Sequence, residues 1–299
     1  MIEGANILRT KLKENPILKV AGAFDAMSAK LVELNNFDAV WAGSFAISAT
    51  HALPDASILT MTEFLSAASN MADACSIPII ADCDTGFGGP SNVSHLVKKY
   101  ENAGIAAICI EDKIFPKQNS LLKDGKQELL AEKDFVAKII AAKAAKNNPN
   151  FMIIARIEAL IAGHGIKEAL KRATAYEIAG ADAILIHSKK NTPDEVFEFC
   201  NTWNGNIPII VIPTTYPTVT LDELKNNNVK MVVYANQSLR AAHWAMSEHL
   251  NQLSNVKSLS EVKTNLTSME DIFHLQEMYK IKKQESDIEK DLKKLGYIN

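Results

Sequence analysis

The segment ENAGIAAICIED, residues 101–112, indicates the fold of this chain because it places a helix end, a buried strand and two acids in one short stretch. A similar segment, EIAGADAILIHS, occupies residues 177–188. In both, an Ala-Gly pair separates a helical pattern from a continuous apolar run, which is typical of a strand buried on both faces of a parallel sheet. The likeness of the two segments indicates a repeated unit of one strand and one helix.

Short apolar runs of this kind recur along most of the chain. Each run is too short for an ordinary helix, and amphipathic helical patterns lie between many of them. Eight such units in roughly 250 residues predict an α/β fold of the closed (β/α)8 barrel type, or TIM barrel, and a doubly wound open sheet is the alternative. The predicted strands are residues 18–24, 37–43, 77–84, 105–112, 151–158, 181–188, 207–213 and 230–236.

The last part of the chain has a different pattern. Residues 257–299 contain no strand pattern, and residues 269–296 read as helix with a charged face. We therefore expect a (β/α)8 barrel domain over residues 1–256 and a C-terminal helical extension over residues 257–299. The extension either is a solvated terminal helix or packs on a neighbouring subunit.

Composition limits the partners of the protein. The chain has 299 residues, 47% of them hydrophobic, and a net charge of −3, so we expect neither a nucleic-acid partner nor an anionic membrane. No apolar run reaches the roughly 18 residues that a membrane span needs. The N-terminal segment has no signal-peptide pattern, and four scattered cysteines predict reduced thiols and a cytoplasmic location. They are Cys75, Cys83, Cys109 and Cys200.

Acidic residues follow neighbouring predicted strands, at the end of a barrel where active sites lie. Asp82 and Asp84 are two residues apart and would share a strand face, and Glu111 ends the next strand. Converging carboxylates are costly unless a cation neutralises them, and Mg²⁺ prefers such oxygen ligands. The sequence therefore predicts a Mg²⁺ site. The alternative is that these acids cap helices or pair with Lys113 and Arg156.

Groups suited to a small anion follow other strands. Arg156 presents a fixed fork for a carboxylate or phosphate, and His187 can donate a hydrogen bond. The backbone amides of residues 43–45 can do the same at a turn. Taken together they predict an anionic substrate beside the metal, although a structural ion pair and a structural histidine remain the alternatives.

The stretch EDKIFPKQNS, residues 111–120, opens a segment without helical or strand periodicity that extends from residue 112 to about residue 130. An irregular segment this long in a compact domain is usually functional and often a lid. Lys113, Lys117, Asn119 and Ser120 would then move with a cover that closes over the substrate and excludes water.

The lid pattern and four other segments resemble one known family, over roughly residues 5–250. The similarity is to phosphoenolpyruvate mutases of the isocitrate lyase superfamily. These segments are EDKIFPKQNS (111–120), AGAFDAMSAKL (21–31), DCDTGFGG (82–89), ARIEALIAG (155–163) and GADAILIHS (180–188).

The resemblance implies interconversion of phosphoenolpyruvate and phosphonopyruvate with Mg²⁺ as cofactor. It also implies a homo-oligomer, a dimer or tetramer, in which the last barrel helix is exchanged between subunits. Asp55 would lie beside the transferring phosphoryl group, as a nucleophile or as an orienting group. The implied site residues are the metal ligands Asp82, Asp84 and Glu111, the catalytic residues Asp55, Lys117, Asn119, Arg156 and His187, and the substrate-binding residues Trp41, Gly43, Ser44, Phe45 and Ser120.

Three other functions compete with the mutase. Phosphonopyruvate hydrolase would share the metal and anion residues, but we expect a residue other than Asn119 at that lid position. Isocitrate and methylisocitrate lyases use a lid cysteine, and residues 112–130 contain none. A barrel that binds a carboxylate ligand without catalysis is the alternative of another class.

Overall fold

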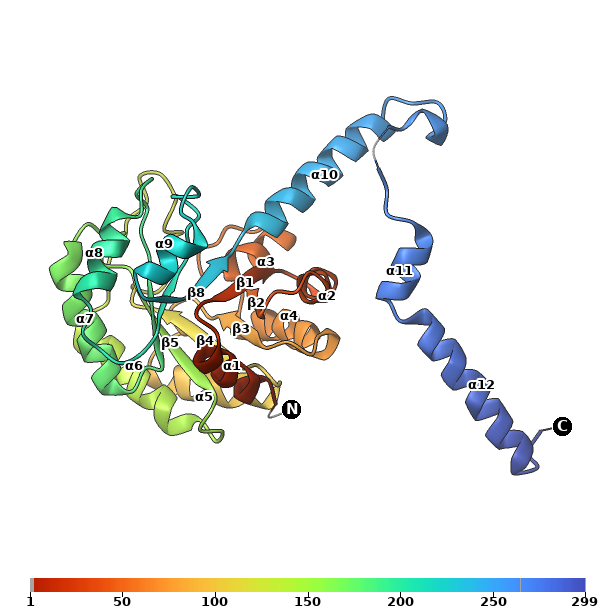
Figure 1. Cartoon of the computed structure of the whole chain (residues 1–299), viewed down its shortest axis with the longest axis horizontal. Helices are drawn as coiled ribbons and strands as arrows, with labels where there is room; N and C mark the ends of the chain where they lie inside the picture. The colour runs from red at the N-terminus through yellow and green to blue at the C-terminus, as the bar shows by residue number, and fades with distance from the viewer. Residues whose placement is uncertain (1–2, 264, 299) are drawn as a thin grey trace. The chain divides into compact units, whose positions relative to one another are not determined.

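The computed structural model describes residues 3–263 and 265–298, and it contains the predicted (β/α)8 barrel (Figure 1). Parallel strands pair in chain order, and β1 also pairs with β8, with Val20 opposite Val233. This pairing closes the barrel and excludes the open sheet. The strands are β1 (Leu18–Ala23), β2 (Ala39–Ala42), β3 (Ile79–Asp82), β4 (Ala107–Glu111), β5 (Met152–Ile157), β6 (Ala183–Ile186), β7 (Ile209–Val211) and β8 (Val229–Tyr234).

Helices follow the strands and surround the barrel (Figure 1). The periodicity did not predict the helices of the N-terminal part, α1 to α4, or the short helix α9. Two of them had a signal in the sequence, because Thr60 and Glu63 form a capping box at the start of α4, and Thr220 and Glu223 form one at the start of α9. The helices of the barrel are α1 (Glu3–Glu14), α2 (Ala26–Leu34), α3 (Ser44–Thr50), α4 (Met61–Ala74), α5 (Pro90–Asn102), α6 (Glu132–Ala145), α7 (Gly165–Ala179), α8 (Asp194–Thr202) and α9 (Leu221–Asn226).

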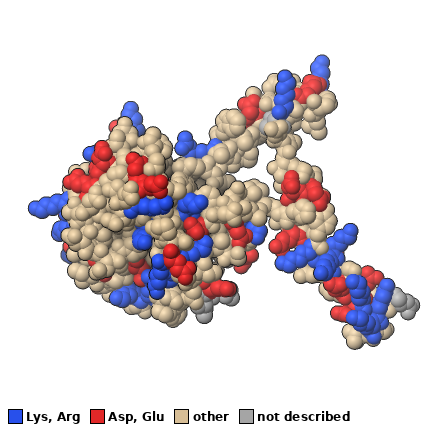
Figure 2. All heavy atoms as spheres, in the orientation of Figure 1, with Lys and Arg blue, Asp and Glu red and all other residues tan. Residues whose placement is uncertain are grey.

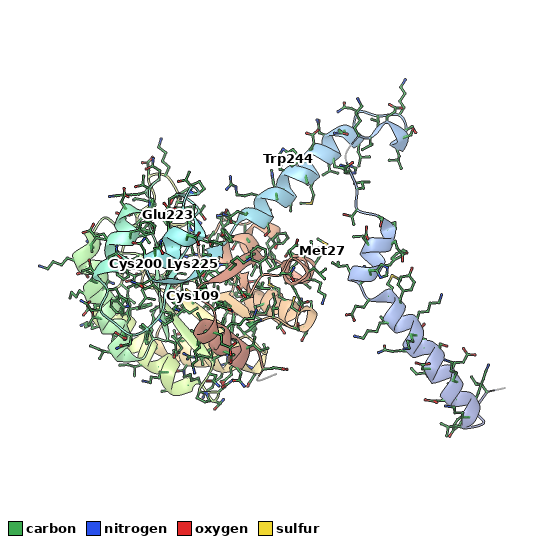
Figure 3. The ribbon with its side chains drawn as sticks, in the orientation of Figure 1. Met27, Cys109, Cys200, Glu223, Lys225 and Trp244 are labelled. Carbon is green, nitrogen blue, oxygen red and sulfur yellow. The ribbon has the colours of Figure 1, made fainter. Side chains whose placement is uncertain are left out.

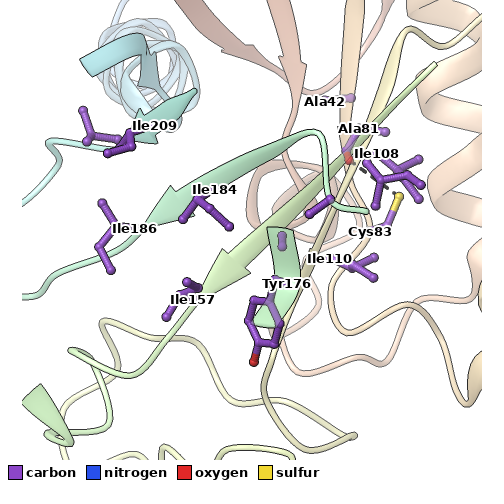
Figure 4. Packing of buried hydrophobic residues seen from close by; sticks show 14 of the residues in the cluster. Ala42, Ala81, Cys83, Ile108, Ile110, Ile157, Tyr176, Ile184, Ile186 and Ile209 are labelled. Carbon is purple, nitrogen blue, oxygen red and sulfur yellow. Dashed lines mark hydrogen bonds between the residues drawn. The ribbon is translucent and has the colours of Figure 1, made fainter. Parts of the chain in front are cut away.

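Residues of each strand alternate between two buried layers, which explains why the strand sequences are apolar throughout. In β4, Ile108 and Ile110 belong to the layer between the strands and the helices (Figure 4), whereas Ala107 and Cys109 belong to the barrel interior. Leu8 of α1 is fully buried in the interior cluster. The barrel interior is therefore packed with side chains, and an active site is expected at the ends of the strands.

One glycine allows two backbone segments to approach closely. A Cβ atom at Gly22, in β1, would lie 2.0 Å from the carbonyl oxygen of Ala235. Such a contact is far inside van der Waals distance, so a larger residue would push apart the first and last strands of the barrel.

The chain divides into two compact units, Met1–Ala241 and Ala242–Asn299, and the boundary lies within α10 (Gln237–Leu253). The predicted domain boundary at residue 256 stays a prediction. No described residue of α10 is buried, and Trp244 is 70% exposed (Figure 3). The single helix predicted over residues 269–296 is interrupted, because Glu277 has a φ angle of 55°. The elements of this unit are η1 (Leu259–Glu261), α11 (Met269–Leu275) and α12 (Met278–Lys294).

Charged side chains of both signs are interspersed on the face of the barrel that Figure 2 shows. Over residues 3–263 and 265–298, no helix is both long enough and apolar enough for a membrane span. The four cysteines are free thiols.

Candidate active site

A cavity of about 160 Å³ lies at the carboxyl-terminal ends of the barrel strands. Asp82, Arg156 and His187, from β3, β5 and the residue after β6, all line it. Asp84 and Glu111 do not line the cavity and are each 1% exposed. The structure thus brings residues from distant parts of the sequence to one place. The other predicted site residues in the lining are Trp41, Gly43, Ser44, Phe45, Asp55, Lys117, Asn119 and Ser120.

The ammonium group of Lys117 lies among carboxylates. Its Nζ atom is 2.7 Å from Asp84 Oδ1 and 3.1 Å from Asp55 Oδ1, and it donates to Ser44 Oγ at 3.2 Å. Burial alone would lower the pKa of Lys117, but the surrounding carboxylates, Asp84 foremost, raise it well above its usual value. Lys117, within residues 112–130, therefore places a positive charge in an acidic cluster.

Asp84 reaches this cluster from a turn and not from a strand. Strand β3 ends at Asp82, and Asp84 adopts a positive φ angle of 50°. Its backbone amide is 3.3 Å from Asp82 Oδ1, and Ser44 donates to Asp82 Oδ2 at 2.9 Å. Burial raises the pKa of Asp84 to about 6, against the lowering effect of Lys117. The two aspartates converge as predicted, but not through the strand alternation on which the prediction relied.

Glu111 is the least compensated acid of the site. Both of its carboxylate oxygens are buried without a hydrogen-bond partner in the part of the chain that the structure describes, although Oε2 lies 3.3 Å from Arg156 Nε. Buried carboxylate oxygens that accept no hydrogen bond, in the neighbourhood of Asp82 and Asp84, are oxygen donors of the kind that Mg²⁺ prefers, so the chemistry of the donors fits a magnesium ion. The described side chains include no group of three or more His, Cys, Asp and Glu already spaced around a metal position. The metal ligands stay a prediction.

Asn119 contacts the acidic cluster from the lid. Its Nδ2 atom donates to Asp55 Oδ2 at 2.7 Å, and its Oδ1 atom accepts from the backbone amide of Leu121 at 2.9 Å. The second bond fixes which end of the amide faces Asp55. The lid is irregular as predicted, and Ile114 and Glu128 pair at its base through a backbone hydrogen bond of 3.1 Å.

A second cluster surrounds Glu158, which is fully buried directly after β5. Its Oε1 atom accepts from Arg156 Nε at 2.6 Å and lies 2.9 Å from His187 Nδ1. Its Oε2 atom accepts from Ser120 Oγ at 2.5 Å and lies 3.3 Å from Lys113 Nζ. Sequence analysis gave Glu158 no role, although its place two residues after Arg156 at a strand end was a signal for one.

The charges of the second cluster are mutually compensated. Burial opposes ionisation of Glu158, but Arg156, His187 and Lys113 together hold its pKa well below the usual range. Burial and the neighbouring Arg156 lower the pKa of His187. At neutral pH the cluster thus contains an anionic Glu158 and a neutral imidazole beside Arg156 and Lys113, and Arg156 also faces Glu111.

A parallel (β/α)8 barrel with acids, a guanidinium and an imidazole at its strand ends, under a polar lid, defines the enzyme class of the phosphoenolpyruvate mutase/isocitrate lyase superfamily. A family model described as phosphoenolpyruvate phosphomutase matches residues 8–254. The chain belongs to this family, as the resemblance predicted.

Relatives with two different activities are similar to the chain. It is 44% identical to a phosphonopyruvate hydrolase from Variovorax sp. (strain Pal2), over 90% of this chain and 93% of the relative. It is 41% identical to a phosphoenolpyruvate phosphomutase from Tetrahymena pyriformis, over 90% of each chain. These identities place the chain in the family without separating the two activities.

Solved structures share the whole fold. The crystal structure of phosphoenolpyruvate phosphomutase from Streptomyces platensis subsp. rosaceus has a TM-score of 0.93 at 45% identity, covering 95% of this chain and 99% of that one. A phosphonopyruvate hydrolase solved in complex with oxalate and Mg²⁺ has a TM-score of 0.89 at 40% identity, covering 95% and 98%. A relative of the same fold therefore binds Mg²⁺ together with a small dicarboxylate.

Proposed function

We propose that the chain is a phosphoenolpyruvate mutase, which interconverts phosphoenolpyruvate and phosphonopyruvate. The observation that carries the proposal is that two lid residues, Asn119 and Lys117, contact the carboxylate of Asp55. Asn119 donates to this carboxylate at 2.7 Å, and Lys117 lies 3.1 Å from it. A carboxylate held by two lid groups at the cavity wall suits a reaction in which the cover must be shut before the phosphoryl group moves.

The reaction breaks the bond between phosphorus and the enolate oxygen and forms a bond between phosphorus and carbon. Arg156 and His187 would hold the phosphoryl oxygens, and Asp55 would orient or receive the phosphoryl group. Because this transition state is loose, positioning and charge supply most of the catalysis. The small cavity and the lid would keep water from the phosphorus atom.

Magnesium would be held by Asp82, Asp84 and Glu111, partly through water. When bound, Mg²⁺ supplies Lewis-acid stabilisation of the negative charge on the pyruvate enolate. Lys117 would compensate the remaining acidic charge when the lid is closed, since its ammonium group lies 2.7 Å from Asp84.

Phosphonopyruvate hydrolase is the second candidate, and the relative at 44% identity favours it. The two reactions differ in the fate of phosphorus. Phosphorus NMR of phosphonopyruvate incubated with the enzyme and Mg²⁺ would show phosphoenolpyruvate for the mutase. Inorganic phosphate in stoichiometric amount would establish the hydrolase and contradict the proposal, and an unchanged spectrum would favour the non-catalytic barrel.

We also propose a homo-oligomer, a dimer or tetramer, that exchanges its C-terminal helices. Trp244, Met246 and Leu250 of α10 are 59–70% exposed, which is unusual for large apolar side chains on one helix. Light scattering coupled to gel filtration should give the mass of two or four chains, and Trp244→Glu should lower it. A monomeric wild-type enzyme would contradict this assembly. The cytoplasmic location stays a prediction.

A further inference from the structure

An arginine on the outside of the barrel contacts both ends of the lid. Arg172 lies on α7, does not line the cavity and is 6% exposed. Its Nη1 atom donates to Asp112 Oδ2 at 3.0 Å and to the carbonyl oxygen of Leu130 at 3.1 Å. Asp112 and Leu130 are the first and last residues of the lid. One guanidinium nitrogen therefore joins the two stems of the lid.

The stem residue Asp112 is in turn joined to the strand that carries the anion-binding arginine. Its Oδ1 atom accepts from the backbone amide of Glu158 at 2.9 Å, and its own amide donates to the Arg156 carbonyl at 3.1 Å. Its carbonyl accepts from the Leu130 amide at 2.8 Å. Asp112 is fully buried, and burial raises its pKa against the opposing effect of Arg172. Without a cation, its charge would be costly.

The guanidinium group is held in one orientation by two further side chains of the same helix. Arg172 Nε donates to Glu168 Oε1 at 2.8 Å, and Nη1 donates to Tyr176 Oη at 3.1 Å. Tyr176 Oη donates to Asp112 Oδ2 at 2.8 Å. Nε and Nη1 thus have acceptors at two separate positions, which the single nitrogen of a lysine ammonium would not match.

We propose that Arg172 is a positioning residue that sets the spacing of the two lid stems, so that Lys117 and Asn119 reach Asp55 when the lid closes. The inference rests on the proposed function, because it assigns lid closure to the reaction. Among the described residues, the side chain of Arg172 forms hydrogen bonds with none that lines the cavity, so its effect would be transmitted through Asp112 and Leu130.

The test compares Arg172→Gln with Lys171→Gln, which removes the same charge from the neighbouring position. Lys171 is 61% exposed and makes surface ion pairs with Glu132 and Glu168, whose loss should have little effect. Hydrogen exchange of the ligand-free enzymes should be at least about tenfold faster over residues 113–130 in Arg172→Gln and unchanged in Lys171→Gln. In the same variant, KM should rise and kcat should fall, each by about tenfold, because the lid groups are misplaced.

Folding of the variants is checked by thermal unfolding and by hydrogen exchange outside the lid. Wild-type exchange of the lid in folded Arg172→Gln would overturn the proposal. If Arg172→Gln does not fold, the hydrogen-exchange test is made on Arg172→Lys, which keeps a cation beside Asp112 but lacks the guanidinium group. Faster lid exchange in that variant supports the proposal, and a wild-type rate overturns it. The exchange result does not depend on which reaction phosphorus NMR reveals. Failure of the proposed function is therefore distinguishable from failure of the role proposed for Arg172.

Discussion

The candidate site has two halves that differ in charge: an acidic half around Lys117 and a basic half around Glu158. In the acidic half, Lys117 faces Asp55 and Asp84, with Asp82 and Glu111 close by, so negative charge is in excess. In the basic half, cations and carboxylates are more nearly balanced: Glu158 lies among Arg156, Lys113 and His187, and Arg156 Nε also lies 3.3 Å from Glu111 Oε2. Under the proposed function, the acidic half would hold the metal ion, and Arg156 and His187 of the basic half would hold the phosphoryl group.

The largest effect is expected in the acidic half. Asp55→Ala should lower kcat by about a thousandfold or more, because Asn119 and Lys117 lose the carboxylate that they hold at the cavity wall. Phosphorus NMR measures the rate, and Asp222→Ala, at an 86% exposed carboxylate, is the control. Turnover close to that of the wild type would remove Asp55 from the mechanism.

Changing the central carboxylate of the basic half should affect both activity and folding. Glu158→Gln leaves Arg156 and Lys113 without their shared buried anion, which is expected to cost about 3 kcal/mol of unfolding free energy. We expect kcat/KM to fall about a hundredfold, since Arg156 and His187 lose their orientation. Denaturant unfolding and steady-state kinetics measure the two effects. A variant as stable and as active as the wild type would mean that the two halves do not differ as described.

Two neighbouring lid residues contact different halves and allow a direct comparison. Asn119→Ala should lower kcat about a hundredfold and leave the melting temperature nearly unchanged, because its contact with Asp55 lies at the cavity. Ser120→Ala should lower kcat only about tenfold but cost about 1–2 kcal/mol of stability, because Ser120 Oγ contacts buried Glu158 and Lys113. If Asn119→Ala and Ser120→Ala changed kcat and stability by the same amounts, the proposed difference between the two halves would be contradicted.

A pH dependence of stability is also expected in the acidic half. The pKa of Asp84 is raised from 3.8 to about 6 on folding, so the folded state holds its proton more tightly. The stability that this proton contributes is present below pH 3.8 and is lost as the pH rises through about 6; its size is about 3 kcal/mol at most. Urea unfolding in a chelator, at pH values between 4 and 7.5, should show this loss for the wild type relative to Asp84→Asn. Parallel curves for the two proteins would contradict the raised pKa.

The fold could be predicted because the buried strands of a parallel barrel appear in the sequence as short apolar runs at regular spacing. The strand ends of β3 and β4 could be predicted as a site for the same reason, since acids such as Asp82 and Glu111 stand out after apolar residues. The helices α1 to α4 were missed, although the capping pattern of Thr60 and Glu63 marks the start of α4. The break at Glu277 was missed because a positive φ angle in a charged residue leaves no mark in the periodicity.

Contacts between distant residues could not be predicted from spacing. Glu158 belongs to the site through its contacts with Ser120 and His187, which are 38 and 29 positions away in the sequence. Arg172 looked like an ordinary charge on a helix, and only the structure shows that its partners are the stems of the lid. The turn conformation of Asp84 was likewise invisible, although the convergence with Asp82 was predicted.

The adjacency of Asn119 and Ser120 has a practical consequence for engineering. Because consecutive residues contact opposite walls, an insertion or deletion between residues 113 and 120 would misplace every contact that follows it. The hairpin tip is different: Lys123, Asp124 and Lys126 are exposed. A fluorophore attached through a cysteine at Lys123 would therefore report the opening of the cover in real time without touching the groups beneath it.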